Sequence, residues 1–184
     1  MNEDVSRPEV LERRQIRMMI YAALMAALTA VGAWIAIPLG PVPIVLQNLF
    51  IYLAGLLLGS RWATASVAVY LLAGACGLPV FAGGMGGIGR FAGPTGGYLA
   101  GYLPAVFLLG LISEKRPGVL PDVIGMILAT AVIYGAGTVW LHVLTGMSWA
   151  KTLAVGMVPF LPGDVIKIAA AGIARTLRPM VKKE

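Results

Sequence analysis

Six apolar runs, each close to the length that crosses a lipid bilayer, take up most of this chain of 184 residues. A helix needs about 20 mostly apolar residues to span the hydrocarbon core of a membrane. Hydrophobic residues make up 59% of the chain and charged residues 12%, which leaves too little polar surface to cover a soluble domain of this size. We therefore predict an all-α membrane protein, a bundle of six transmembrane helices. The predicted spans are 18–37, 44–59, 63–80, 96–112, 119–145 and 152–177.

Basic residues flank these spans unevenly. If the spans alternate in direction, one side of the membrane holds Arg90 and Lys151. The other side holds Arg13, Arg14, Arg17, Arg61, Lys115, Arg116, Arg175, Arg178, Lys182 and Lys183. Under the positive-inside rule the crowded side is cytoplasmic. Both termini are therefore expected in the cytoplasm.

Three regions are expected along the chain. Residues 1–17 form a short cytoplasmic N-terminal segment, residues 18–178 a six-helix transmembrane substrate-binding domain, and residues 179–184 a basic cytoplasmic tail. Because the first segment mixes acidic residues with arginines and has no small-residue cleavage site after its apolar run, it is not expected to be a removable signal peptide. The single Cys76 cannot form an intramolecular disulfide. We predict no cofactor, no metal site and no nucleic-acid partner.

The first span carries two interleaved rows of small residues, which are Ala22, Ala23, Ala26, Ala27 and Ala30. In lipid, small residues four positions apart let helix backbones approach closely and are a main route to packing. The rows therefore predict a docking face. Spacing alone leaves open whether this face packs inside the bundle or against a separate membrane partner.

A glycine-rich connector, residues 81–97, joins the third and fourth spans on the predicted outer side. It contains G-x-G-x-x-G, but a dinucleotide site needs a preceding strand and a helix that opens within the motif. Membrane spans flank it here, so that function is rejected. Glycine permits backbone conformations closed to other residues and close approach to a ligand. We expect a lid, with a merely flexible connector as the alternative, and Arg90 as a contact to an anionic ligand or to lipid phosphates.

Two adjacent amides, Gln47 and Asn48, follow Pro38, Pro41 and Pro43 at the predicted outer end of the second span. Such amides often only satisfy backbone groups or face lipid headgroups. The alternative is that they donate hydrogen bonds to a ligand, and Gln47 is the stronger candidate of the two.

The last span holds an unlike charge pair, Asp164 and Lys167. Pro159 and Pro162 break any helix through them, so a helix is expected to restart at Pro162 with Asp164 in its first turn. Residues three apart share a helix face, so both side chains can point into one cavity. Ionisable residues inside a membrane usually mark a substrate or ion site, although a mutual ion pair that fixes the helix is the alternative. Such a site suits a small amphiphile, with Lys167 for its carboxylate and Asp164 for ring N–H groups.

Catalytic signals are weak. His142 is the single histidine, and the H-E-x-x-H, G-x-S-x-G and Walker motifs are all absent. We therefore predict a protein that is not an enzyme and has no nucleotide site of its own.

Four runs in order along the chain resemble one family. They are GPVPIVLQ at 40–47, GLPVFAGG at 77–84, GPTGGY at 93–98 and FLPGDVIK at 160–167. These runs are similar to the BioY family, the biotin-binding S components of energy-coupling factor (ECF) transporters. The resemblance implies a six-helix bundle in a prokaryotic cell membrane that captures biotin from outside. It also implies a transmembrane coupling subunit and two cytoplasmic ATPase subunits as partners, although some family members are described as acting without a dedicated module.

The resemblance also implies site residues. The family's motif in the sixth helix corresponds to Asp164 and Lys167, and its glycine-rich loop to residues 83–97. The alanine motif that docks the coupling subunit falls on Ala22/Ala26 or on Ala23/Ala27, and the register stays open. The predicted substrate-binding residues are Asp164, Lys167, Arg90, Gln47, Gly84, Gly87, Thr95, Gly96 and Tyr98.

Two other functions remain as alternatives: an S component for another small carboxylate vitamin, and a structural membrane protein without a ligand. A screen of vitamins for thermal stabilisation separates them. An intramembrane enzyme ranks third and would require product formation by purified protein.

Overall fold

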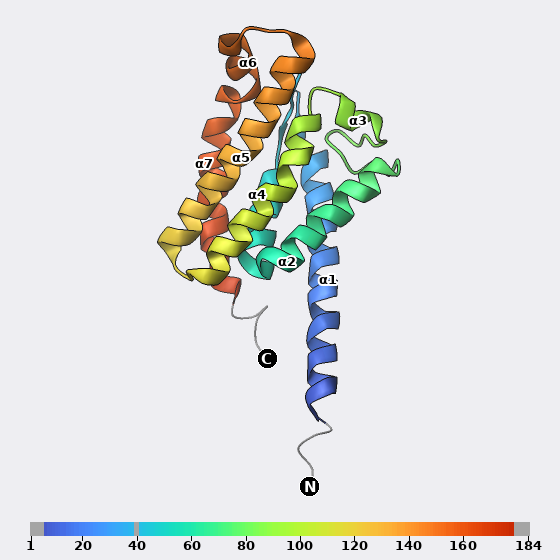
Figure 1. The fold of residues 1–184 in the computed structure, drawn as a ribbon, viewed down its shortest axis with the longest axis vertical. Coiled ribbons are helices and arrows are strands. Elements are labelled where there is room, and N and C mark those ends of the chain that lie inside the picture. Colours follow the sequence, from blue (N-terminus) through green and yellow to red (C-terminus); the bar gives the residue numbers. More distant parts are fainter. Residues whose placement is uncertain (1–5, 39–40, 179–184) are drawn as a thin grey trace.

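The computed structural model describes residues 6–38 and 41–178, so the expected basic tail at 179–184 lies outside the described residues. Helices dominate the chain, and one short strand pair interrupts them (Figure 1). The elements are α1 (Ser6–Trp34), β1 (Ala36–Ile37), β2 (Ile44–Val45), α2 (Gln47–Ala75), α3 (Gly89–Ala92), α4 (Gly96–Lys115), α5 (Val119–Thr145), α6 (Trp149–Gly156) and α7 (Leu161–Ala174), with 3-10 turns at Val158–Phe160 and Arg175–Leu177.

Five helical stretches of the described chain are long and apolar enough to cross a membrane. They are Glu12–Trp34, Gln47–Ala75, Gly96–Lys115, Val119–Thr145 and Trp149–Ile173. Large apolar side chains cover their outward faces, among them Ile20, Leu72, Val143, Ile166 and Ile173, each more than 60% exposed. An apolar surface of this extent is suited to lipid and not to water. The chain is a multi-pass membrane protein.

Helix α2 changes direction at Gly59, where the backbone leaves helical geometry with φ 79° and ψ −179°. Only glycine adopts this φ readily, and a Cβ here would also overlap the Glu114 carboxylate. The Ser60 hydroxyl donates to Glu114 Oε2 on α4 at 2.6 Å, which ties the bend to the neighbouring helix. Figure 1 shows one arm of α2 descending to the bend and the other rising toward α3. These arms occupy the region where the sequence predicted separate spans at 44–59 and 63–80.

The core lies where α2, α4 and α5 meet. Its fully buried side chains are Ile51, Leu56, Leu109, Met126, Ile133 and Leu141. Close approach between α4 and α5 depends on Gly137, because any side chain there would collide with the ring of Tyr98. On α1, Ala22 and Ala26 are buried in the same core.

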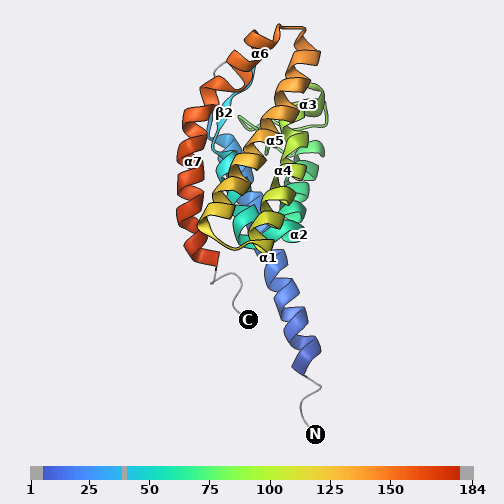
Figure 2. The same ribbon diagram turned by 60° about the vertical axis from the view of Figure 1, so that its left-hand side comes forward.

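The beginning of α1 and the end of α7 lie at one end of the bundle, and α3 and α6 lie at the other (Figures 1 and 2). α1 already begins at Ser6, inside the segment expected to lead into the membrane. Its first turns project beyond the other helices in both views. At the opposite end, β1 pairs antiparallel with β2, with Ala36 opposite Val45 and Ile37 opposite Ile44.

Two tryptophans bond to the glycine-rich connector and to the residues just before it. The indole N–H of Trp34 at the end of α1 donates to the Pro79 carbonyl at 2.7 Å. The indole N–H of Trp140 on α5 donates to the Gly93 carbonyl at 2.9 Å. In addition, the Gly83 amide donates to the Ala33 carbonyl at 3.2 Å. The connector is therefore fastened to two different helices.

Candidate functional site

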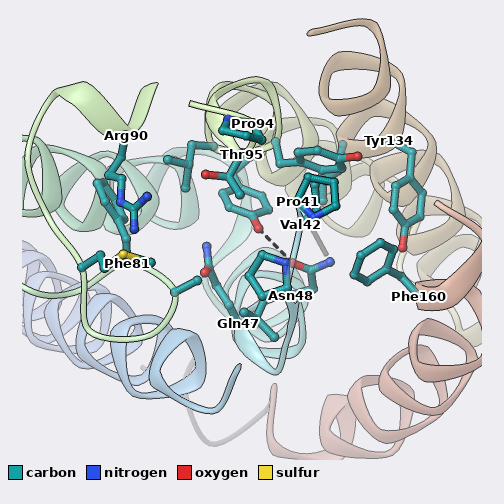
Figure 3. Close-up of a pocket in the computed structure, with 18 of the residues that line it drawn as sticks. Pro41, Val42, Gln47, Asn48, Phe81, Arg90, Pro94, Thr95, Tyr134 and Phe160 are labelled. Atoms are coloured by element: carbon teal, nitrogen blue, oxygen red, sulfur yellow. Dashed lines mark hydrogen bonds between the residues drawn. The ribbon is translucent and has the colours of Figure 1, made fainter. Parts of the chain in front are cut away.

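A cavity of about 260 Å³ lies among the connectors and helices at the α3 end of the bundle (Figure 3). Segments far apart in the sequence form its wall: the segment between β1 and β2, the start of α2, the glycine-rich connector, α4, α5 and α7. The lining residues are Pro38, Pro41, Val42, Pro43, Val45, Gln47, Asn48, Phe81, Ala82, Met85, Arg90, Pro94, Thr95, Tyr98, Leu99, Tyr102, Ile133, Tyr134, Phe160 and Lys167.

Helix α7 supplies the buried charge pair. A 3-10 turn at Val158–Phe160 precedes α7, which begins at Leu161, one residue before the predicted restart. Asp164 and Lys167 lie on one face of α7, as their spacing predicted, and are 3% and 7% exposed. Lys167 Nζ is 3.1 Å from Asp164 Oδ1. The Lys167 ammonium therefore reaches the cavity wall already paired with the Asp164 carboxylate.

Tyr134 of α5 completes this end of the cavity. Its hydroxyl donates to Asp164 Oδ2, the oxygen that does not face Lys167. Its ring lies beside Tyr98, with centroids 6.5 Å apart, and beside Phe160 at 6.4 Å. Asp164 itself does not line the cavity; it lines a second, more open groove between α5 and α7, which Tyr134 also borders.

Two adjacent amides at the start of α2 face the cavity from another side. Gln47 is 2% exposed, and its Nε2 has no hydrogen-bond partner among the described residues. Asn48 is already engaged, since its Oδ1 accepts a hydrogen bond of 3.2 Å from the Tyr102 hydroxyl. A buried donor without an acceptor costs about 1–3 kcal/mol. A ligand oxygen placed near Gln47 would remove that cost.

Arg90 of α3 lines the cavity from the glycine-rich connector. In Figure 3 it lies at the opposite end of the cavity from Tyr134 and Phe160, with Gln47 and Asn48 between them. Within the described residues Arg90 makes no ion pair. The cavity thus has a cation at each end, one with a carboxylate partner and one without.

Aromatic and apolar side chains fill the space between the polar groups. They include Phe81, Leu99, Ile133 and Phe160. Apolar walls with a few placed polar groups are typical of sites for small molecules. The arrangement suits a small ligand that has an apolar body, an anionic group and hydrogen-bonding oxygen atoms.

The structure brings together part of the predicted set. Lys167, Arg90, Gln47, Thr95 and Tyr98 all line the cavity. The remaining predicted residues, which are Asp164, Gly84, Gly87 and Gly96, do not line it.

The three glycines support the connector instead of lining the cavity. Gly84 lies over the Trp34 ring, and the Gly87 amide donates to the Gly74 carbonyl at 2.7 Å. Gly96 opens α4 against the Phe91 backbone.

The sequence did not identify several lining residues, among them Tyr102, Tyr134, Phe81 and Phe160. In a helix that is apolar all round, no amphipathic period indicates which aromatic side chain faces inward. The three prolines before α2 were singled out in the sequence, and Pro38, Pro41 and Pro43 do line the cavity.

The two alanine rows of α1 face different surroundings. Ala22 and Ala26 are 7% exposed, whereas Ala23 and Ala27 are exposed and Ala30 is half-buried. One row therefore packs inside the bundle and the other faces outward.

Comparison with known proteins identifies one family. Residues 3–183 match the sequence profile of the BioY family. The chain is 41% identical over 158 residues to the biotin transporter BioY of Thermotoga maritima, covering 86% of this chain and 93% of that protein. It is 44% identical over 184 residues to the biotin transporter BioY of Rhodobacter capsulatus, covering 91% of this chain and 94% of that protein. A crystal structure of the S-component for biotin from an ECF-type ABC transporter superposes with a TM-score of 0.84 at 33% identity, covering 90% of this chain and 93% of that one.

Proposed function

This chain belongs to the BioY family, and we propose that it is the substrate-capture (S) component of a biotin uptake system. It acts as a transporter subunit and not as an enzyme. The observation that carries the proposal is the cavity, in which Lys167, Arg90 and the unpartnered amide of Gln47 converge on one apolar space.

Biotin has chemical groups that match this space. Because Arg90 and Lys167 lie at opposite ends of the cavity, only one of them can hold the single carboxylate of biotin. Arg90 can attract that carboxylate, and Lys167 and the Gln47 amide can donate to the oxygen of the ureido ring. The aromatic walls, including Tyr98, cover its apolar body. Thr95 adds a hydroxyl to the cavity wall, from the same connector as Arg90.

The glycine-rich connector acts as the lid over bound biotin. Its backbone is held by Gly84, Gly87 and Gly96, and the Trp34 and Trp140 indoles fasten it to α1 and α5. Release of one fastening point would let the lid open while the other point keeps it near the cavity.

The chain crosses the plasma membrane of a prokaryotic cell six times, with the two arms of α2 counted as separate spans that meet at Gly59. Both termini are cytoplasmic and the cavity opens outward. Support comes from the basic residues near the beginning of α1 and the end of α4, and from the cavity, whose lining residue Arg90 lies on α3 at the other end of the bundle.

Uptake requires an ECF module of one transmembrane coupling subunit and two cytoplasmic ATPase subunits. The coupling subunit docks on the outward alanine row of α1, Ala23 and Ala27. Small exposed residues allow close approach of a partner helix. Ala22 and Ala26 serve the packing of the bundle instead, and Ala30 lies at the border between the two surroundings.

Titration of the purified protein in nanodiscs with biotin tests this function. We expect saturable one-site binding by calorimetry, with a matching change in tryptophan fluorescence from Trp34 or Trp140. Folded protein that does not bind biotin would refute the proposal. Stabilisation by another vitamin acid, without stabilisation by biotin, would reassign the substrate.

A further inference from the structure

The carboxylate of Asp164 is held by two helices. Oδ1 faces Lys167 Nζ of its own helix at 3.1 Å, and Oδ2 accepts from the Tyr134 hydroxyl of α5. Asp164 borders the groove between α5 and α7, whereas Lys167 borders the cavity. The carboxylate therefore lies behind the ammonium with respect to the cavity.

Other hydroxyls of the same groove form hydrogen bonds with groups other than Asp164. Thr130 Oγ1 donates to the Met126 carbonyl at 2.7 Å and also pairs with the Tyr52 hydroxyl at 2.6 Å. Thr138 Oγ1 donates to the Tyr134 carbonyl at 2.6 Å. Among the described residues, Tyr134 is thus the groove hydroxyl that reaches Asp164.

A carboxylate in an apolar environment needs a hydrogen bond to each oxygen, because an unsatisfied buried charge is strongly unfavourable. Without the Tyr134 hydroxyl, Oδ2 would face the apolar groove. Asp164 would then turn away, and Lys167 would lose the counter-ion that holds its ammonium at the cavity wall.

We infer that Tyr134 is a positioning residue: its hydroxyl holds Asp164 in place, and Asp164 in turn holds the Lys167 ammonium toward the substrate. The Tyr134 ring also borders the cavity, but phenylalanine would provide the same ring. The hydroxyl acts through the charge pair. This inference rests on the proposed biotin function.

A double-mutant cycle tests it. Biotin affinity is measured by calorimetry in nanodiscs for the wild type, Tyr134→Phe, Asp164→Asn and the double variant. We expect Tyr134→Phe to weaken binding about tenfold in the wild type, since a hydrogen bond to a charged group is lost, and less than about twofold in Asp164→Asn. Tyr70→Phe is the matched control, because Tyr70 is a buried tyrosine that does not line the cavity, and it should leave affinity unchanged.

Each other outcome overturns the inference. Equal weakening in both backgrounds would mean that the hydroxyl contacts biotin or acts on packing. No weakening would mean that the hydroxyl has no part in binding. Misfolding of Tyr134→Phe where Asp164→Asn folds would assign the hydroxyl to the fold. If the folded wild type does not bind biotin, the proposed function falls as well, whereas binding with an additive cycle removes this inference alone.

Discussion

At the α7 end of the cavity the charges are already paired, whereas Gln47 in the middle and Arg90 at the α3 end have no side-chain partner within the described residues. Lys167 faces Asp164, and Asp164 also accepts from Tyr134. Within the part of the chain that the structure describes, Arg90 makes no ion pair and the buried amide nitrogen of Gln47 has no acceptor. The α7 end is organised before a ligand arrives, whereas Gln47 and Arg90 gain partners only when a ligand binds.

This difference has a consequence for stability. Removing one member of a pair that forms without a ligand leaves its partner buried and unsatisfied, which destabilises the empty protein. Groups that await a ligand are unfavourable in the empty protein. Substitutions of Lys167 and of Gln47 should therefore change the stability of the empty protein in opposite directions, while both weaken binding.

The largest effect on biotin binding is expected at the α7 end of the cavity, where Lys167 and Asp164 are paired. Lys167→Ala and Asp164→Asn should each weaken biotin binding at least about tenfold, roughly 1.4 kcal/mol. Lys167→Ala should also lower the melting temperature of the empty protein, because it leaves Asp164 without a cation. Calorimetry and thermal unfolding measure the two effects, and Lys151→Ala, an exposed lysine on α6, is the control. Unchanged titration curves for both variants would remove the site assignment.

In the middle of the cavity, Gln47→Leu should weaken biotin binding about fivefold, the equivalent of about 1 kcal/mol. It should also raise the melting temperature of the empty protein. The gain in stability is expected because the unpartnered buried amide is replaced by an apolar side chain of similar size. The same two measurements apply, with Gln15→Leu, an exposed glutamine, as the control. A lowered melting temperature would show that the amide has a partner in the empty protein, and the comparison between Lys167 and Gln47 would fail.

Arg90→Ala should weaken binding of biotin about threefold, because a half-buried cation contributes less than a fully desolvated one. The melting temperature should not change, since no ion pair is lost. Binding of biotin amide, which lacks the carboxylate charge, should be unaffected by this substitution. Equal losses for biotin and its amide would mean that Arg90 does not recognise the carboxylate.

The smallest effect concerns the lid. Trp34→Phe keeps an aromatic ring beneath Gly84 but removes the hydrogen bond to the Pro79 carbonyl. We expect dissociation of biotin about twofold faster, because one partly exposed hydrogen bond holds the lid less firmly. Stopped-flow chase with unlabelled biotin measures the rate. A slower dissociation would contradict the role of Trp34 as a fastening point.

Much of the site could be predicted from the sequence because its signals are local. The spacing of Asp164 and Lys167 indicates a shared helix face, and charges are rare enough inside membrane spans to mark a site. Gln47 and Arg90 stand out for the same reason in an apolar chain. Tyr134 and Tyr102 gave no such signal, since aromatic residues occur on lipid-facing and inward faces alike.

Composition and residues close together in the chain were enough to predict the membrane class, the family and the charge pair. Only the folded chain shows which alanine row faces outward, that Asp164 turns toward Tyr134 and away from the cavity, and that the Gln47 amide nitrogen has no partner among the described residues. Those features depend on how α5 packs beside α7 and how the connectors fold over α2. Such contacts join residues far apart in the chain, and in lipid no simple hydrophobic pattern reports them.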